Sequence, residues 1–120
     1  MIMTEEQKNL LMRDLCARLL YKVCAQIPDE YGSYTSTIES IDIDGFVKDF
    51  EGKLIEIEYI KPYLFPLSSM TEEQKEDMIK SSCGIGSDKN VFDWFNKNHF
   101  DYRGLIPLGL AIDCTNLNIY

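Results

Sequence analysis

The chain has 120 residues, a formal net charge of −8 and 45% hydrophobic residues. This length and apolar content are sufficient to bury a core, so the sequence predicts one folded domain over residues 1–120 and excludes wholesale disorder. No apolar stretch reaches the roughly 18 residues that cross a bilayer, and the first residues lack the basic and apolar segments of a signal peptide. We therefore expect a soluble cytoplasmic protein without membrane contact.

Helical segments are expected in three places. The hexapeptide Met-Thr-Glu-Glu-Gln-Lys occurs at residues 3–8 and again at 70–75, and in both copies a capping Thr precedes a Gln by three residues. Because the flanks differ, we interpret the copies as two helix starts and not as a duplicated domain. The first helix is predicted over residues 4–18, the second over 71–81, and a short third around 91–95 that ends by about 99.

The predicted first helix has a core face and a solvent face. Leu11, Leu15 and Leu19 repeat at helical spacing and should be buried. Lys8, Arg13, Asp14 and Arg18 are assigned to solvent.

Strand-forming segments follow the first helix. A β-favouring run over residues 19–27 ends at Pro28, residues 28–34 are predicted as a loop, and three short strands are expected at 38–43, 46–50 and 54–60. Residues 61–66 contain two prolines and should leave the sheet, and the apolar stretch 104–112 should be tucked into the core, where it could form a last strand. The expected fold is α+β: an antiparallel sheet of about four strands, with the N-terminal helix and two later helices packed on one face.

Acidic residues are concentrated in the middle of the chain. Between residues 29 and 58, nine carboxylates stand against two lysines. Period two along the predicted strands places Asp42, Asp44, Glu56 and Glu58 on the face away from the core. A solvated face, a surface for a basic protein partner and a site for a hard cation are the three interpretations, in that order of preference.

The second candidate site is the segment His99, Asp101, Tyr102 and Arg103, which offers a proton carrier, a carboxylate and a guanidinium within five residues. It would suit a phosphate or carboxylate ligand or acid–base chemistry if the side chains converged on one cavity. The structural interpretation, which the sequence favours, is a helix-terminating turn in which Arg103 pairs with Asp93 or Asp101.

Other motifs carry less information. The four cysteines, Cys16, Cys24, Cys83 and Cys114, form no CxxC pair, so neither zinc nor disulfides are expected, and neither is a Cys/His nucleophilic pair. Residues 83–86 have two glycines but lack the Lys of a phosphate loop. Phe92 and Phe95 share a helical face from which Trp94 is turned away, so one aromatic ring is expected to be exposed. We expect no cofactor and no bound metal.

Several strings carry a resemblance: Asp-Leu-Cys-Ala-Arg-Leu at residues 14–19, Ile-Lys-Pro-Tyr-Leu at 60–64, Pro-Leu-Ser-Ser-Met-Thr-Glu-Glu at 66–73, Asp-Trp-Phe-Asn-Lys-Asn at 93–98, His-Phe-Asp-Tyr-Arg-Gly-Leu-Ile at 99–106 and Gly-Leu-Ala at 109–111. They resemble a family of short uncharacterised proteins from phages and mobile elements of gut anaerobic bacteria. The resemblance leaves residues 28–59 outside and implies no activity, cofactor or catalytic residue. Members of that family tend to have Pro and Gly where this chain has Leu20 and Lys22.

Three functional hypotheses follow from the sequence. The leading one is a non-enzymatic accessory protein of phage or mobile-element origin that binds a basic protein through the acidic face; direct nucleic-acid binding is disfavoured because phosphates would be repelled. The alternative is a small enzyme or ligand-binding protein with a site at His99–Arg103. A virion component is the third. The sequence does not decide whether the chain is an enzyme, nor its oligomeric state.

Overall fold

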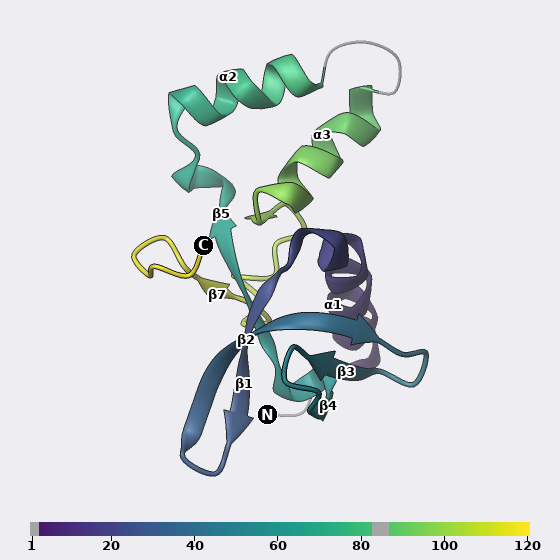
Figure 1. Ribbon diagram of the computed structural model, residues 1–120. Helices are drawn as coiled ribbons and strands as arrows, with labels where there is room; N and C mark the ends of the chain where they lie inside the picture. Colours follow the sequence, from purple (N-terminus) through teal and green to yellow (C-terminus); the bar gives the residue numbers. More distant parts are fainter. Residues whose placement is uncertain (1–2, 83–86) are drawn as a thin grey trace.

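The computed structural model describes residues 3–82 and 87–120 (Figure 1), and its first two helices begin with local capping chemistry. Helix α1 spans Glu5–Arg18, α2 spans Glu72–Ser81 and α3 spans Ser87–Lys97. Both copies of the hexapeptide form complete capping boxes. The Thr4 hydroxyl accepts the Gln7 N–H at 3.1 Å, and the Gln7 side chain accepts the Thr4 N–H at 3.0 Å. Thr71 and Gln74 do the same for α2, which confirms two independent helix starts.

The described residues form a mixed sheet. Its strands are β1 Cys24–Asp29, β2 Gly32–Ile41, β3 Phe46–Asp49, β4 Leu54–Glu56, β5 Lys61–Pro66, β6 Phe100–Asp101 and β7 Ile112–Asp113. The order is β4-β3-β2-β1-β5-β6, with β7 also paired to β5. The β1, β2, β3 and β4 pairings and the β1–β5 pairing are antiparallel, whereas β6 and β7 pair parallel with β5. The α+β class is confirmed, but the sheet has more strands than predicted and is not purely antiparallel.

Residues 28–34, predicted as a loop, are mostly strand. The antiparallel register runs from Cys24↔Thr37 to Asp29↔Gly32, so only two residues connect β1 and β2. The Asp29 carboxylate accepts the Tyr31 N–H at 2.9 Å and Gly32 takes a positive φ of 123°. The prediction was wrong because Pro28 lies next to the turn of the β1–β2 hairpin. A proline at that position does not end the strand.

Residues 61–66 do not leave the sheet; they form β5, which lies between β1 on one side and β6 on the other. The two prolines of β5 are tolerated because each of its three partner strands pairs with only two β5 residues. β1 pairs at Lys61 and Pro62, β7 at Tyr63 and Leu64, and β6 at Phe65 and Pro66. No partner strand needs an unbroken series of donors along β5.

The connection from α1 to β1 is a single 3₁₀ turn, η1 Leu19–Tyr21, so the first strand begins five residues later than predicted. The turn ends at Lys22, which has the left-handed conformation with φ 55° and whose N–H donates to the Leu19 carbonyl at 3.4 Å. Glycine is the residue that adopts this conformation without strain.

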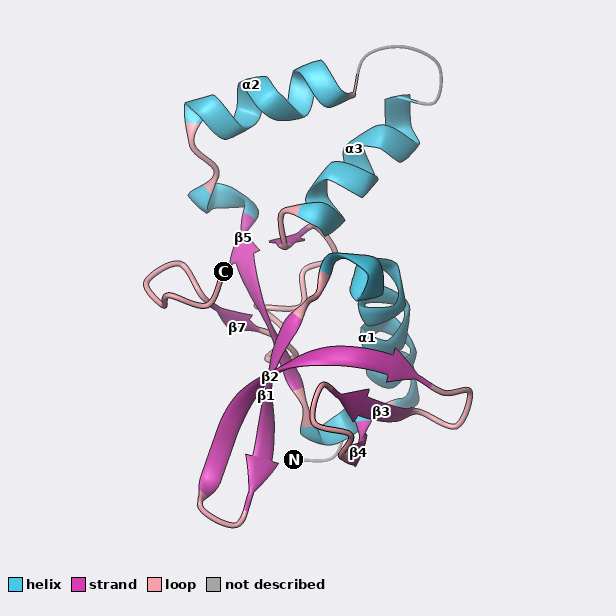
Figure 2. Ribbon diagram, in the orientation of Figure 1, coloured by secondary structure: helices cyan, strands magenta, loops and turns pink. Residues whose placement is uncertain are grey.

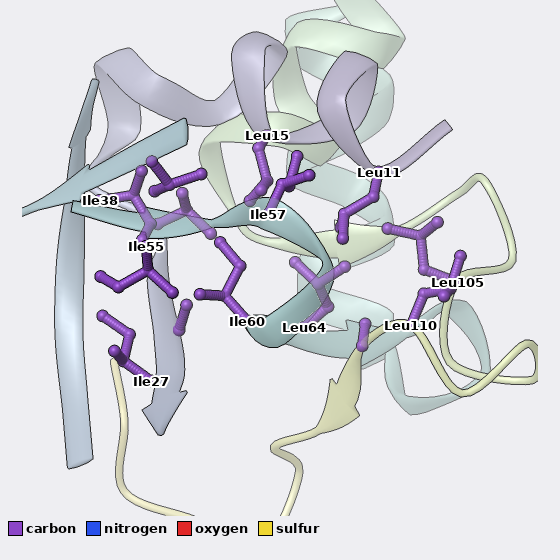
Figure 3. Close-up of a cluster of buried hydrophobic side chains, with 14 residues drawn as sticks. Leu11, Leu15, Ile27, Ile38, Ile55, Ile57, Ile60, Leu64, Leu105 and Leu110 are labelled. Atoms are coloured by element: carbon purple, nitrogen blue, oxygen red, sulfur yellow. The ribbon is translucent and has the colours of Figure 1, made fainter. Parts of the chain in front are cut away.

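One cluster of apolar side chains joins α1, the sheet and the tail (Figure 3). Leu11 and Leu15 project from α1 as predicted and are fully buried. The tail, residues 104–112, contributes Leu105, Leu110 and Ala111. The prediction that this stretch enters the core is therefore confirmed, and Ile112 begins the short β7.

Helices α2 and α3 lie past the end of β5, at the opposite end of the molecule from the β1–β2 hairpin (Figure 2). α3 packs on β6 and on α1, and α2 packs on α3. The two helices thus form a pair at one end of the molecule in place of a layer on the sheet face. Within the described residues, no helix has the length and apolar character needed to cross a membrane.

The left-handed conformation of Lys22 gives a stability prediction. Lys22→Gly should raise the free energy of unfolding by roughly 0.5–1 kcal/mol, because relief of backbone strain exceeds the extra entropy of an unfolded glycine. Urea unfolding measures the difference. Lys48→Gly, in the regular strand β3, is the matched control and should lower stability by about 1 kcal/mol. If both variants lose stability equally, Lys22 is not strained.

Candidate functional site

Asp14 and Arg18, which the helical pattern assigned to solvent, form a fully buried ion pair. Both residues have no exposed surface. The Arg18 Nε donates to Asp14 Oδ2 at 2.9 Å and Nη2 donates to Oδ1 at 3.1 Å. The prediction was wrong because residues 14 and 18 continue the stripe of Leu11 and Leu15 and are buried as an ion pair.

Arg18 also connects α1 to the end of α3. Its Nη1 donates to the Phe95 carbonyl at 3.3 Å and its Nη2 to the Phe100 carbonyl at 2.5 Å. Arg103 completes the group, because its Nη1 donates to Asp14 Oδ1 at 2.8 Å. Arg103 therefore pairs with Asp14, on a distant helix, and not with Asp93 or Asp101 as the sequence suggested.

Tyr102 fills the space beside these two cations. Its ring centre lies 5.4 Å from the Arg18 guanidinium carbon and 4.5 Å from that of Arg103. The Tyr102 hydroxyl donates to the Asn96 side chain at 3.0 Å. Cation–π contact and the hydrogen bond hold the ring between α1 and α3.

Asp101 caps the turn that follows β6. One carboxylate oxygen accepts the Leu105 N–H at 2.8 Å and the other accepts the Ile106 N–H at 2.9 Å. The residue is only 7% exposed. Both oxygens thus hold backbone donors in place, as an Asp in a turn commonly does.

His99 ends α3 in a left-handed conformation, with φ 63° and its N–H donating to the Asn96 carbonyl at 3.3 Å. The side chain is 9% exposed, and its Nδ1 has no hydrogen-bond partner among the described residues. Burial, and then the positive charge of Arg18, lower the pKa of His99 to about 4. At neutral pH the imidazole is therefore uncharged.

Contacts that stabilise the fold engage each residue of the second candidate site: His99, Asp101, Tyr102 and Arg103. Four surface hollows of about 190 to 470 Å³ are lined by other residues. We find no cavity among these four on which the segment converges. Acid–base chemistry by this segment would require a shared cavity, and these hollows do not provide one.

The acidic surface, defined as Asp42, Asp44, Glu56 and Glu58, lies at the opposite end of the sheet. Asp42 and Asp44 occupy the turn between β2 and β3, where Asp42 Oδ1 accepts the N–H groups of Asp44 at 2.9 Å and Phe46 at 3.0 Å. Glu56 ends β4, and Glu58 lies in the 3₁₀ turn η2 Ile57–Tyr59. Only Glu56 belongs to a strand, so the acidic surface is a cluster of turns and not the sheet face that was predicted.

A backbone hydrogen bond brings the two halves of the acidic surface together. The Ile57 N–H donates to the Gly45 carbonyl at 2.9 Å, which places η2 against the β2–β3 turn. The pKa of Glu56 is raised, first by a hydrogen bond to the Glu58 carboxyl, then by partial desolvation and by the Glu58 charge, while Lys8 opposes the shift. The Glu56 and Glu58 carboxyls therefore lie close enough to interact.

Exposed apolar side chains accompany the acidic surface. Ile43 is 94% exposed, Leu54 64% and Tyr59 60%. Phe46, opposite Glu56 in the β3–β4 register, is half-exposed. The described residues include no group of three or more His, Cys, Asp or Glu side chains placed to hold a metal ion, so the cation interpretation gains no support.

The remaining motifs have structural positions. Trp94 is buried, stacks on Phe100 with ring centres 5.5 Å apart, and donates from its indole nitrogen to Asp77 of α2 at 2.8 Å. Phe92 is the half-exposed ring, 5.2 Å from Tyr102. The expectation of one exposed aromatic is met by Phe92. Residues 83–86, with the possible phosphate loop and Cys83, lie outside the described residues.

Comparison with known proteins yields no relative. No protein-family model, no curated protein and no solved structure matches the chain at a significant level.

The buried ion group predicts a large stability effect. Asp14→Asn should lower the free energy of unfolding by about 3 kcal/mol or more, because Arg18 would remain buried with its charge uncompensated. Denaturant unfolding measures the loss. Asp93→Asn, an exposed carboxylate on α3, is the control and should change stability by no more than about 0.5 kcal/mol. Similar small losses in both variants would contradict the assignment.

His99 is the single histidine of the chain, so its titration can be followed directly by NMR. The imidazole should titrate near pH 4 in the folded protein, below the unfolded value of about 6.5. The stability that comes from the neutral ring is then complete above about pH 6.5 and is lost as the pH falls towards 4. Between pH 6.5 and 5 the wild type should lose about 1.5 kcal/mol more than His99→Asn. A normal midpoint near 6.5 would disprove the burial of the ring.

Proposed function

We propose that this chain is a small non-enzymatic interaction protein, of phage or mobile-element origin, that binds a basic protein partner through the acidic surface. The observation that carries the proposal is the joining of Asp42, Asp44, Glu56 and Glu58 at one end of the sheet, next to exposed apolar side chains. The origin follows only from the sequence resemblance. The partner class follows from charge and chemistry.

Electrostatics favours a cationic partner. The chain carries a formal net charge of −8, and the pKa of Glu56 is raised by a hydrogen bond to Glu58, by desolvation and by the Glu58 charge. Lys or Arg side chains of a partner would relieve this repulsion and would also steer the encounter. Phosphate backbones would be repelled, so a protein is a better partner than a nucleic acid.

The exposed apolar side chains beside the acidic surface favour a protein interface over a merely solvated patch. Ile43 and Leu54 are aliphatic residues with most of their surface in water, and Tyr59 is a mostly exposed aromatic one. Apolar and aromatic residues surrounded by charges resemble the core and rim of a protein interface. A basic segment with apolar residues between its cations fits this arrangement.

The competing hypothesis, an enzyme or ligand site at His99–Arg103, receives less support. Asp101 and Arg103 are engaged by the Leu105 and Ile106 amides and by Asp14. The His99 ring has a pKa far below neutrality. These residues hold α1, α3 and the tail together, which is a structural role.

Affinity capture with a charge-neutralised variant tests the proposal. The variant carries Asp42→Asn, Asp44→Asn, Glu56→Gln and Glu58→Gln; the Asn at 42 keeps an acceptor for the turn. The wild type should retain a basic protein from a host-cell lysate at about 50 mM salt and release it at about 300 mM. The purified partner should bind the variant at least about tenfold more weakly by calorimetry, since several rim charges are lost.

A matched control removes the same charge elsewhere. Glu30→Gln, Glu39→Gln, Glu76→Gln and Asp93→Asn alter four exposed carboxylates outside the acidic surface. This control should bind the partner within about threefold of the wild type if position matters more than net charge. Equal weakening in both variants would show that net charge, and not the position of the carboxylates, determines binding. Unchanged binding by the variant neutralised at the acidic surface would refute the proposal.

A further inference from the structure

The side chain of Tyr120 replaces a hydrogen bond of the sheet. β1 and β5 pair at Ala25↔Pro62 and Gln26↔Lys61, so Cys24 and Tyr63 are the next positions in register. The Tyr120 hydroxyl accepts the Cys24 N–H at 2.9 Å and donates to the Tyr63 carbonyl at 2.8 Å. A phenol therefore bridges two backbone groups that an ordinary antiparallel ladder would join directly.

The ring of Tyr120 occupies an aromatic site. It stacks on the His99 ring with centres 3.7 Å apart and planes 9° apart, and the Phe65 ring lies 6.0 Å away. His99 is nine-tenths buried beneath it, and the Nδ1 of that ring has no partner. Tyr120 is 45% exposed, so it covers the His99 ring only from one side and leaves one buried polar atom unsatisfied.

The segment that carries Tyr120 is otherwise weakly attached. Residues 115–118 are exposed, and the Leu117 N–H bonds to the Cys114 carbonyl within the same segment. Among the described residues, the hydrogen bonds that join residues 116–120 to β1 and β5 are made by the phenol of Tyr120, while the Leu117 bond reaches only Cys114. The end of the chain lies beside β5 in Figure 1.

We infer that the space between the Cys24 N–H, the Tyr63 carbonyl and the His99 ring is a binding site for small para-substituted phenols, which Tyr120 occupies as an exchangeable ligand. Opening of the tail exposes one donor, one acceptor and an aromatic face in fixed positions. A phenol presents the complementary hydroxyl and ring. Toluene, which has the same shape without the hydroxyl, cannot bridge the two backbone groups.

Hydrogen exchange at the Cys24 amide reports the opening directly, because its acceptor is the Tyr120 hydroxyl. In the wild type this amide should show a protection factor at least about tenfold lower than the Ile38 amide, which is bonded to the Val23 carbonyl inside the sheet. Equal protection at both amides would mean that the tail opens only on global unfolding. That result would overturn the inference without any variant.

A substitution supplies the second arm. Tyr120→Ala should expose the Cys24 amide, and p-cresol, the side-chain analogue of tyrosine, should slow its exchange again by the factor 1 + [ligand]/Kd. Toluene should slow it at least about tenfold less at equal concentration. Tyr31→Ala, at the fully exposed hairpin tip, should give no p-cresol effect at Cys24 beyond that of the wild type. Equal protection by toluene, or none by p-cresol, would overturn the inference.

Discussion

The guanidinium of Arg18 is the constraint on which the arrangement of the chain depends. It has no exposed surface, and its donors reach Asp14 on α1, Phe95 on α3 and Phe100 on β6. A buried cation is tolerated only where its charge and its donors are satisfied. This one side chain therefore ties α3 and β6 to α1, its guanidinium lies over the Tyr102 ring, and its partner Asp14 also binds Arg103.

The two ends of the molecule differ in the burial of their polar side chains. Around Arg18, polar and aromatic groups are buried and serve the packing of α1, α3 and the tail. At the other end, the β2–β3 turn and η2 expose carboxylates and apolar side chains together. The functional-looking residues His99–Arg103 belong to the first end. The acidic surface belongs to the second, where side chains are free to meet a partner.

Local chemistry predicted much of the fold, and long-range contacts account for the rest. The capping boxes at Thr4 and Thr71 gave both helix starts, because capping depends on residues within four positions. The central place of β5 could not be predicted, since it depends on pairing with β6 and β7, which are far along the chain. Likewise the helical pattern assigned Asp14 and Arg18 to solvent, because their burial depends on the Phe95 and Phe100 carbonyls, about 80 residues away.

We propose that a partner meets the acidic surface and not the His99–Arg103 segment. Backbone amide shifts of the labelled chain, titrated with the basic protein recovered by capture, distinguish these two locations. The largest shifts should lie at residues 42–46 and 54–59 and should disappear at about 300 mM salt. Shifts centred on residues 99–103 and insensitive to salt would contradict it, because they would locate binding at the segment assigned here to structure.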